Sequence, residues 1–355
     1  MDIYYFLFLW IAFLSSLDFF PLPQKIKMIG SSLLLLTVIL FCGLRGDVDN
    51  DYSTYVGHWG TTPIWQEESV KSLFEKINGH LLEFGYVFIC SLFKSIGLGY
   101  QSIFLFCSFL TFTLFYKSAK QFTSYPNFAL FIFFSQFIMM PFMQIRYGVA
   151  MTCTLYAIVN WANGNRRKCV VYIILGILFH RLVWGCLLLI WLLNASFRFV
   201  VFFMLCALFI PFGTIEDIIL GIFSISSFKH YMDYMDKGES ANMLSILWYS
   251  ILVYPYLEKI WRERNRASVK EIVLLKMYLI SLLAFYLASD YSILSRISGV
   301  FSLSICFILP AYYQMLKKDG LHLLVYFFCV SFYCFLKYLP CLKYFKDYTI
   351  NYNLF

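Results

Sequence analysis

Charged residues follow directly on a long apolar run near the start of the chain. The stretch 44–55 reads LRGDVDNDYSTY, in which Arg45 and Asp51 are followed by Tyr52 and Tyr55. Arginine binds phosphate groups through paired donors, and a carboxylate can accept the proton of an attacking hydroxyl. These residues could therefore serve group transfer from a phosphorylated substrate. They could equally form an Arg45–Asp51 ion pair in an ordinary polar loop.

Other polar residues interrupt apolar sequence at separated points. Glu83 and Tyr86 begin an amphipathic stretch, and Arg146 follows Pro141. A histidine and an arginine divide a later apolar run, and a further arginine lies near the start of another; these residues are His180, Arg181 and Arg296. Because an unperturbed histidine titrates near neutral pH, His180 could transfer a proton.

Each of these residues also has a purely structural explanation. Arg146 could be an arginine at a helix end that extends to the membrane surface. His180 could be a structural histidine, and Arg296 could pair with Asp290. Glu83 could serve only to hold the amphipathic helix. The residue types alone leave both explanations open.

The composition is that of a membrane protein. Of 355 residues, 61% are hydrophobic and only 14% are charged, whereas soluble domains average roughly half apolar and a quarter charged residues. Apolar runs of about 17 to 22 residues recur and match the thickness of a bilayer. The net charge of +8 comes from short clusters between these runs, which argues against a nucleic-acid partner. The eleven cysteines lack ligand spacing, so we expect no metal and no cofactor.

Membrane-spanning helices are the elements expected to position the polar residues. We predict an all-α polytopic integral membrane protein with about twelve spans, in one domain over residues 1–355. The predicted spans are 4–20, 28–43, 102–118, 128–142, 144–162, the two halves of 169–193, 199–213, 241–257, 272–289, 293–315 and 321–338.

The basic clusters between the spans decide the topology, because lysine and arginine favour the cytoplasmic side. Keeping these clusters inside makes 44–101 and 214–240 outer loops. The segment 81–97 is then an amphipathic helix on the outer face, and 169–193 becomes a hairpin with His180 and Arg181 at its outer tip.

This topology collects the isolated polar residues on one face. They are Arg45, Asp51, Glu83, Arg146, His180, Arg181 and Arg296. The positive-inside rule predicts few arginines on the outer face, so their enrichment there favours a function. Several guanidinium groups near the lipid surface would suit the diphosphate of a lipid carrier.

The order of these motifs resembles the EpsG/Wzy-type family of bacterial O-antigen and capsular polysaccharide polymerases. The family's first motif is an arginine followed by Asp-Tyr and a second tyrosine, as at Arg45, and its second is Glu-x-Gly-Tyr, as at Glu83. A later Arg-Gln corresponds to Arg146 followed by Tyr147, and Phe-His with a nearby serine corresponds to Phe179 and His180 followed by Leu182. A late arginine and a closing Pro-x-x-Lys complete the pattern, here Arg296, Pro340 and Lys343.

The resemblance implies a metal-independent glycosyltransferase in the bacterial inner membrane that acts on the periplasmic side. Such a polymerase moves a growing glycan from undecaprenyl diphosphate onto an incoming lipid-linked repeat unit, as in lipopolysaccharide biosynthesis. A chain-length regulator protein is a possible further partner. By this resemblance Arg146 and Arg296 would bind the diphosphate, supported by Arg45 and Arg181. Asp51 or His180 would be the base, with Glu83 a weaker candidate. The remaining substrate contacts would come from Tyr52, Tyr55, Tyr86 and Lys343.

Three other functions remain open at this point. A flippase or transporter of lipid-linked oligosaccharides would also need about a dozen spans, but it would carry charges at mid-membrane depth and repeated halves. A membrane acyltransferase would need a histidine with an acidic partner deeper in the membrane. An O-antigen ligase would share the chemistry and usually has one large late outer loop, and the loop 214–240 is of modest size.

Overall fold

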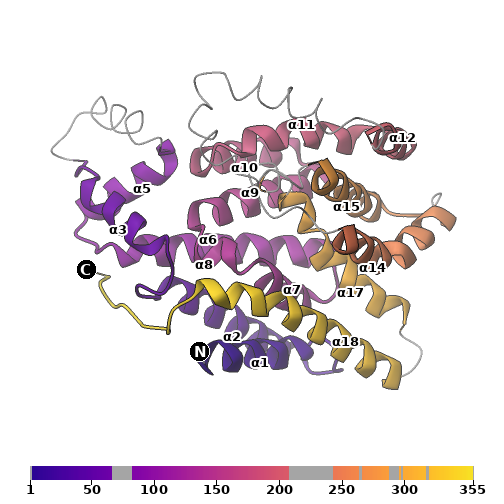
Figure 1. Ribbon diagram of the computed structural model, residues 1–355, viewed down its shortest axis with the longest axis horizontal. Helices are drawn as coiled ribbons and strands as arrows, with labels where there is room; N and C mark the ends of the chain where they lie inside the picture. Colours follow the sequence, from indigo (N-terminus) through magenta and orange to yellow (C-terminus); the bar gives the residue numbers. More distant parts are fainter. Residues whose placement is uncertain are drawn as a thin grey trace. The chain divides into compact units, whose positions relative to one another are not determined.

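The computed structural model of the protein is built from helices (Figure 1). It describes residues 2–65, 82–207, 243–263, 266–287, 296, 299–316 and 320–354. Among these residues the only β-bridge joins Arg45 to Ile350. The predicted outer loop 214–240 lies outside the described residues.

The chain divides into two compact units. The first comprises Met1–Arg181 and Leu309–Phe355, and the second comprises Leu182–Ile308. The helices of the first unit are α1 (Asp2–Ser16), α2 (Gln24–Gly43), α3 (Tyr52–Thr61), α5 (Phe84–Ser95), α6 (Gln101–Phe122), α7 (Pro126–Phe137), α8 (Met139–Phe142), α9 (Ile145–Ala162), α10 (Arg166–Phe179), α18 (Gly320–Tyr338) and the 3-10 helix η2 (Leu339–Tyr344). Those of the second unit are α11 (Val183–Asn194), α12 (Phe197–Ala207), α14 (Met243–Arg262) and α15 (Val269–Leu287), and the boundary between the units falls inside α17 (Ile305–Met315).

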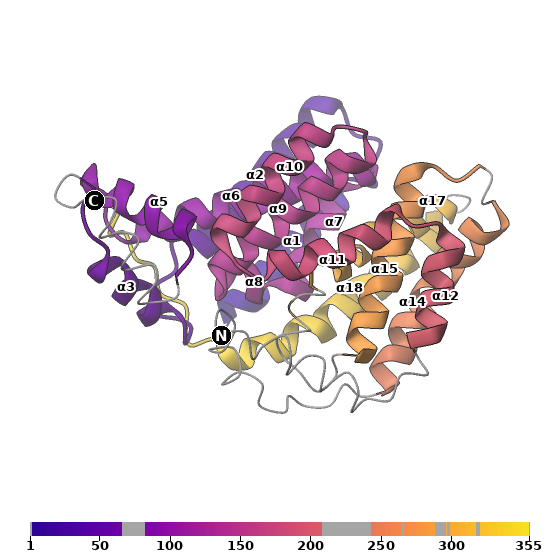
Figure 2. The same ribbon diagram turned by 90° about the horizontal axis from the view of Figure 1, so that it is seen from above.

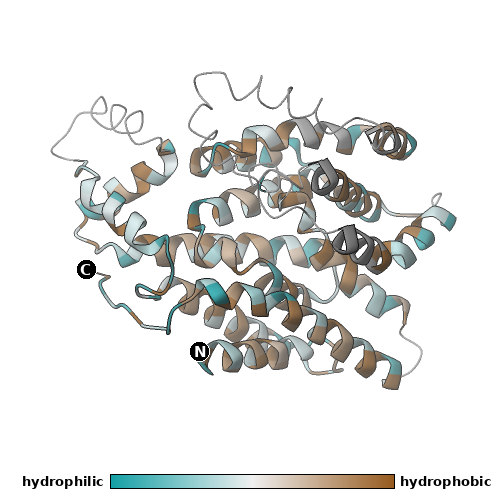
Figure 3. Ribbon diagram, viewed as in Figure 1, coloured by the Kyte–Doolittle hydropathy of each residue, from teal (hydrophilic) through white to brown (hydrophobic). Residues whose placement is uncertain are grey.

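Three of the described helical segments are long and apolar enough to cross a membrane. They are Gln24–Gly43, Gln101–Phe122 and Gly320–Tyr344. Other apolar helices are shorter, among them α1 and α7. The membrane-helix character predicted from composition is thus confirmed, whereas the count of about twelve spans stays a prediction. Figure 3 shows hydrophobic residues along the long helices and hydrophilic ones in the links and the C-terminal tail.

Two predicted spans are interrupted. The segment predicted as one span over 128–142 is divided between α7 and α8, with Ile138 as the joint. The run 169–193 is broken between α10 and α11, because His180 takes an extended backbone conformation that ends α10. The break predicted at His180 and Arg181 is therefore confirmed.

A short helix that the sequence analysis did not predict, α3, lies beside α5 (Figures 1 and 2). The Lys94 ammonium near the end of α5 donates to the carbonyl oxygens of Gly60 at 3.2 Å and Thr62 at 2.8 Å, at the end of α3. Helix α5 has only 12 residues, fewer than the roughly 20 that a span needs. This length agrees with the predicted amphipathic helix over 81–97.

Helices α2 and α6 pack in opposite directions and define two ends of the first unit. At one end, Gln101 Nε2 donates to the carbonyl oxygens of Gly43 at 2.8 Å and Arg45 at 2.9 Å. At the other end, Lys27 and Lys117 line one cavity. We call these the arginine end and the lysine end.

The other basic cluster also lies at the lysine end. Asn163, which follows α9, contacts Gln121 near the end of α6 through an amide hydrogen bond of 3.5 Å. Arg166 begins α10 directly after this turn. Within the first unit, the basic clusters at Lys27, Lys117 and Arg166 thus lie at the same end, as the predicted topology requires.

Candidate functional site

The arginine end is built around a fully buried guanidinium group. Arg45 has no exposed surface, and its Nε donates to Asp49 Oδ2 at 2.7 Å while its Nη1 donates to the carbonyl oxygen of Cys42 at 2.9 Å. The rings of Phe104 and Phe142 lie 4.7 and 5.0 Å from the guanidinium carbon. From the sequence, we considered an ion pair between Arg45 and Asp51. In the structure, Arg45 instead forms a buried ion pair with Asp49. A charge in such an apolar setting is stable only when it is paired.

A network of neutral polar groups holds the Arg45 loop in place. Gln101 bridges the end of α2 through its amide donors, and its Oε1 accepts from the Tyr52 hydroxyl at 3.2 Å. Asn351 Nδ2 donates to the Tyr52 hydroxyl at 3.0 Å and to the Tyr100 hydroxyl at 2.6 Å. The first residues of α3 and α6 are therefore fixed against the loop by side-chain hydrogen bonds.

The C-terminal tail runs along the same loop. Its backbone amides donate to this part of the chain, from Lys346 to Val48 at 2.8 Å and from Asn351 to Leu44 at 2.8 Å. In return, Gly46 donates to the carbonyl oxygen of Thr349 at 2.7 Å. The tail thus closes one side of the arginine end (Figure 1).

The second charged pair joins α9 to the start of α5. Arg146 Nη1 forms an ion pair with Glu83 Oε2; the glutamate side chain is 5% exposed and the arginine side chain 21% exposed. The Tyr86 and Tyr55 rings lie 5.5 and 5.9 Å from the guanidinium carbon, within the range of a cation–π contact. Arg146 is therefore oriented by a buried carboxylate and two aromatic rings while part of it stays accessible.

Two glycines allow these helices to approach closely. A Cβ on Gly85 would lie 2.7 Å from the carbonyl oxygen of Leu178 in α10, and one on Gly148 would lie 2.7 Å from that of Met140. Since both distances are shorter than a Cβ tolerates, larger residues would push the helices apart. The glycine in the Glu-x-Gly-Tyr motif thus has a packing function next to Glu83.

The break after α10 supplies the last contacts of this cluster. The backbone amide of Arg181 donates to Glu83 Oε1 at 3.2 Å, so both carboxylate oxygens of Glu83 are engaged. The His180 ring lies edge-on to Tyr147, with their centroids 5.6 Å apart. His180 and the side chain of Arg181 are partly exposed.

Asp51 and Tyr55 lie between the two charged groups. Asp51 immediately precedes α3, accepts the amide proton of Tyr55 on its carbonyl oxygen at 3.1 Å, and is partly exposed. The Tyr55 ring contacts Phe104, which also covers Arg45. Burial raises the pKa of the Tyr55 hydroxyl, which therefore stays protonated and can donate a hydrogen bond at neutral pH.

The structure brings most of the predicted site residues to the arginine end. These are Arg45, Asp51, Tyr52, Tyr55, Glu83, Tyr86, Arg146, His180 and Arg181. Lys343 lies exposed in η2 of the same unit, and Arg296 is helical, partly exposed and part of the second unit. The roles assigned to all of these residues stay predictions.

Three residues that hold the arginine end together were not predicted from the sequence: Asp49, Gln101 and Asn351. Asp49 is one of three aspartates within six residues of Arg45, so its spacing alone did not single it out as the partner. Gln101 was the last residue of the predicted outer loop 44–101 and was assigned no contact. Asn351 stands in a polar tail without periodicity, so no pattern connected it to residues about three hundred positions away.

Comparison with known proteins assigns the family. A family model described as the EpsG family matches residues 29–354, which is nearly the whole chain. The chain belongs to the EpsG family. The match includes every candidate residue of both charged groups, and this EpsG family member is accordingly a membrane protein of the polysaccharide polymerase type. No curated protein and no solved structure matches the chain.

Proposed function

We propose that this EpsG family member is a polysaccharide polymerase that uses a lipid diphosphate as leaving group. It would transfer a growing glycan from undecaprenyl diphosphate to a hydroxyl of an incoming lipid-linked repeat unit. The bond between the anomeric carbon and the diphosphate breaks, a glycosidic bond forms to the acceptor oxygen, and the hydroxyl proton passes to a base. The product would be an O-antigen or a capsular polysaccharide.

The observation that carries the proposal is the oriented and partly exposed guanidinium of Arg146. Negative charge develops on the leaving diphosphate, so fixed positive charge at that point would accelerate the reaction. Glu83 and the rings of Tyr55 and Tyr86 hold Arg146, and 21% of its side chain remains accessible to a ligand. Arg45 is buried, so we propose that it stabilises the loop that carries Asp51 and does not contact the substrate directly. Arg296 is proposed as a second diphosphate ligand, with Arg181 and Lys343 as further contacts.

The proton would pass to Asp51 or His180. Both are partly exposed, whereas Glu83 is 5% exposed with both carboxylate oxygens engaged by Arg146 and Arg181. We therefore assign Glu83 chiefly to positioning Arg146. The variants Asp51→Asn and His180→Gln show which of the two candidates is the base. Loss of the base should lower the rate about 100-fold or more and remove the acidic limb of the pH–rate profile. A variant with an unchanged rate and profile is not the base.

We propose that the protein lies in the inner membrane with its arginine end facing the periplasm. The gathering of the basic clusters at Lys27, Lys117 and Arg166 at the lysine end supports this orientation. A reporter enzyme that is active only outside the cytoplasm, fused after the C-terminal tail, should be active because the tail lies at the arginine end. An inactive reporter in a stable fusion would reverse the proposed orientation.

A deletion of the gene distinguishes polymerization from the related functions. A strain without the polymerase should display glycans of a single repeat unit, while a strain without a flippase or a ligase should display none. In a purified system, the protein and lipid-linked repeat units alone should yield longer glycans and free lipid diphosphate. Loss of surface glycan in the deletion strain, or no elongation in the purified system, would overturn the proposal.

A further inference from the structure

A cavity lined by both basic and apolar residues lies at the lysine end, remote from the charged groups described above. Its volume is about 610 Å³, within the roughly 300–1,000 Å³ typical of ligand pockets. It is formed by the link between α1 and α2, the first turns of α2, the last turns of α6 and the start of α7. The lining includes Lys27, Lys117 and Lys120.

Two residues of the lining, Asp18 and Tyr116, belong to a hydrogen-bond network. The Asp18 carboxylate accepts from the backbone amides of Asn127 at 2.7 Å and Phe128 at 3.1 Å, and from Asn127 Nδ2 at 2.8 Å. The Tyr116 hydroxyl donates to Asn127 Oδ1 at 3.0 Å. Asp18 is the only acid among the described residues that line the cavity, and its carboxylate already caps the N-terminus of α7. One carboxylate does not balance the charge of the three lysines.

The geometry of the wall favours an anion. Lys120 lies over the Tyr116 ring, with its Nζ 4.7 Å from the centroid, and so is held at the cavity edge. The hydroxyl groups of Ser31 and Ser124 add further polar lining. The first turn of α2 also lines the cavity. The N-terminal end of a helix carries partial positive charge, and the first turn of α2 contains no acidic residue that would offset it.

Apolar helix surface adjoins this basic cavity. Met28 belongs to the lining and is 54% exposed, and the neighbouring Ile29 is 68% exposed. A lipid can satisfy both features at once, with its phosphate among the lysines and its acyl chains along α2. We propose that the cavity is a binding site for the phosphate headgroup of an anionic phospholipid, separate from the substrate diphosphate site.

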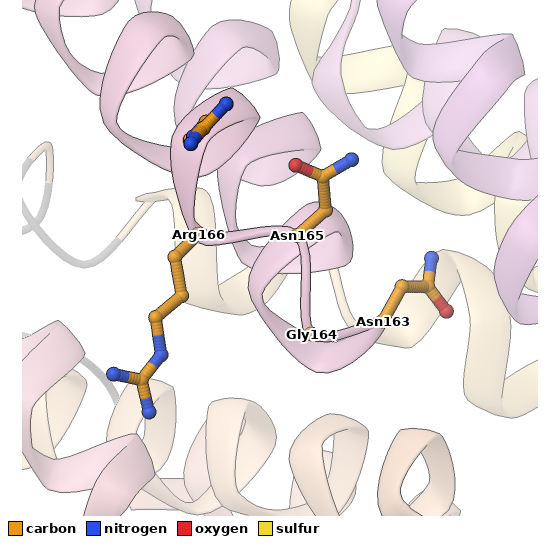
Figure 4. A pocket seen from close by; sticks show the side chains of 5 residues that line it. Asn163, Gly164, Asn165 and Arg166 are labelled. Atoms are coloured by element: carbon orange, nitrogen blue, oxygen red, sulfur yellow. The ribbon is translucent and has the colours of Figure 1, made fainter.

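A second cavity at the same end does not carry a proposal. It is lined by Asn163, Gly164, Asn165, Arg166 and Arg167, all exposed. Figure 4 shows the Arg166 side chain pointing away from the two asparagines. These two arginines do provide a control, because they are basic, lie at the same end and do not line the proposed lipid site.

Lipid binding to the purified full-length protein tests the proposal. Short-chain phosphatidylglycerol is titrated into protein in neutral detergent, with native mass spectrometry and thermal unfolding as readouts. Phosphatidylcholine and inorganic phosphate are titrated in the same way, each in a separate experiment. Phosphatidylglycerol should bind and stabilise the protein, and the other two should have little effect, because one lacks net charge and the other lacks acyl chains.

A triple variant removes the positive charge from the cavity wall. Each lysine near an anionic headgroup contributes about fivefold to affinity, so Lys27→Gln/Lys117→Gln/Lys120→Gln should weaken phosphatidylglycerol binding more than tenfold. The control Lys25→Gln/Arg166→Gln/Arg167→Gln loses the same charge outside the cavity and should bind as the unaltered protein does. Should the triple variant not fold, Lys117→Gln alone, on the exposed surface of α6, should weaken binding about fivefold.

Three outcomes would overturn the proposal. The first is equal affinity of the cavity variant and the unaltered protein, and the second is an equal loss in the control variant. The third is stabilisation by phosphatidylcholine or inorganic phosphate that equals that by phosphatidylglycerol. Each is independent of glycan synthesis, so the test stands whether or not the protein is a polymerase.

Discussion

The Glu83–Arg146 pair gives the sharpest test of the site's architecture. Removing one partner of a buried ion pair typically costs about 3–5 kcal/mol, since the other charge is left unpaired. Because 21% of the Arg146 side chain is exposed and water can partly replace the carboxylate, we expect a smaller coupling of about 2 kcal/mol between the two side chains. Glu83→Ala also removes the acceptor of the Arg181 amide.

A double-mutant cycle measures this coupling. Thermal unfolding in detergent is followed for Glu83→Ala, Arg146→Ala and the double variant, together with glycan elongation by each protein. The double variant should be destabilised by about 2 kcal/mol less than the sum of the single variants. Glu83→Gln keeps one acceptor oxygen, replaces the other with a donor NH2 group and removes the charge, so it should lower elongation about tenfold and leave the fold intact.

An exposed pair on α14 provides the matched control. Arg262 and Glu258 are four residues apart and form a bond of 2.5 Å, but their side chains are 76% and 39% exposed. The same cycle there should give a coupling of no more than about 0.5 kcal/mol. Equal coupling at both pairs, or none at Glu83 and Arg146, would refute the reasoning that burial makes this ion pair a positioning device.

Three further predictions follow from other contacts. Asn351→Ala removes the donors to Tyr52 and Tyr100 and should lower the free energy of unfolding by about 1–2 kcal/mol, as measured by thermal unfolding; an unchanged value would show that the tail does not hold the loop. Burial raises the pKa of Asp18 from 3.8 to about 6, so the folded protein keeps this proton to a higher pH than the unfolded chain, and stability should fall as pH rises through this interval. Asp18→Asn should flatten that part of the stability profile, and a profile identical to that of the unaltered protein would contradict the assignment. Elongation by the purified protein should continue in EDTA, because the predicted catalyst uses guanidinium groups instead of a metal ion, and its abolition would refute metal independence.

Much of the first unit could be predicted because polar residues in apolar sequence have few places to lie. His180 and Arg181 predicted a break in a long apolar run, and α10 does end there. The basic clusters predicted to share one side of the membrane do lie together, because Lys27 and Lys117 line one cavity and Asn163, just before Arg166, contacts the end of α6. The membrane character followed directly from composition.

Other features left no pattern in the sequence. The tail and the Arg45 loop join mainly through backbone hydrogen bonds, which do not depend on residue type. Helix α3 is only ten residues long and mixes polar and aromatic residues, so its periodicity is weak. The partner of Arg45 was ambiguous because three aspartates follow it within six residues. In the structure the buried partner is Asp49, beside an Arg45 guanidinium that Phe104 and Phe142 cover.

Glycan length in cells that carry site variants is the most direct test of the central claim that arginines bind the diphosphate of a lipid-linked glycan. The gene deletion strain is complemented with Arg146→Ala, Arg296→Ala or the control Arg262→Ala, and membrane accumulation of each protein is checked by immunoblot. The two site variants should accumulate normally yet yield only single-repeat-unit glycans, while the control restores long chains. Long chains of normal length from both site variants would contradict the claim.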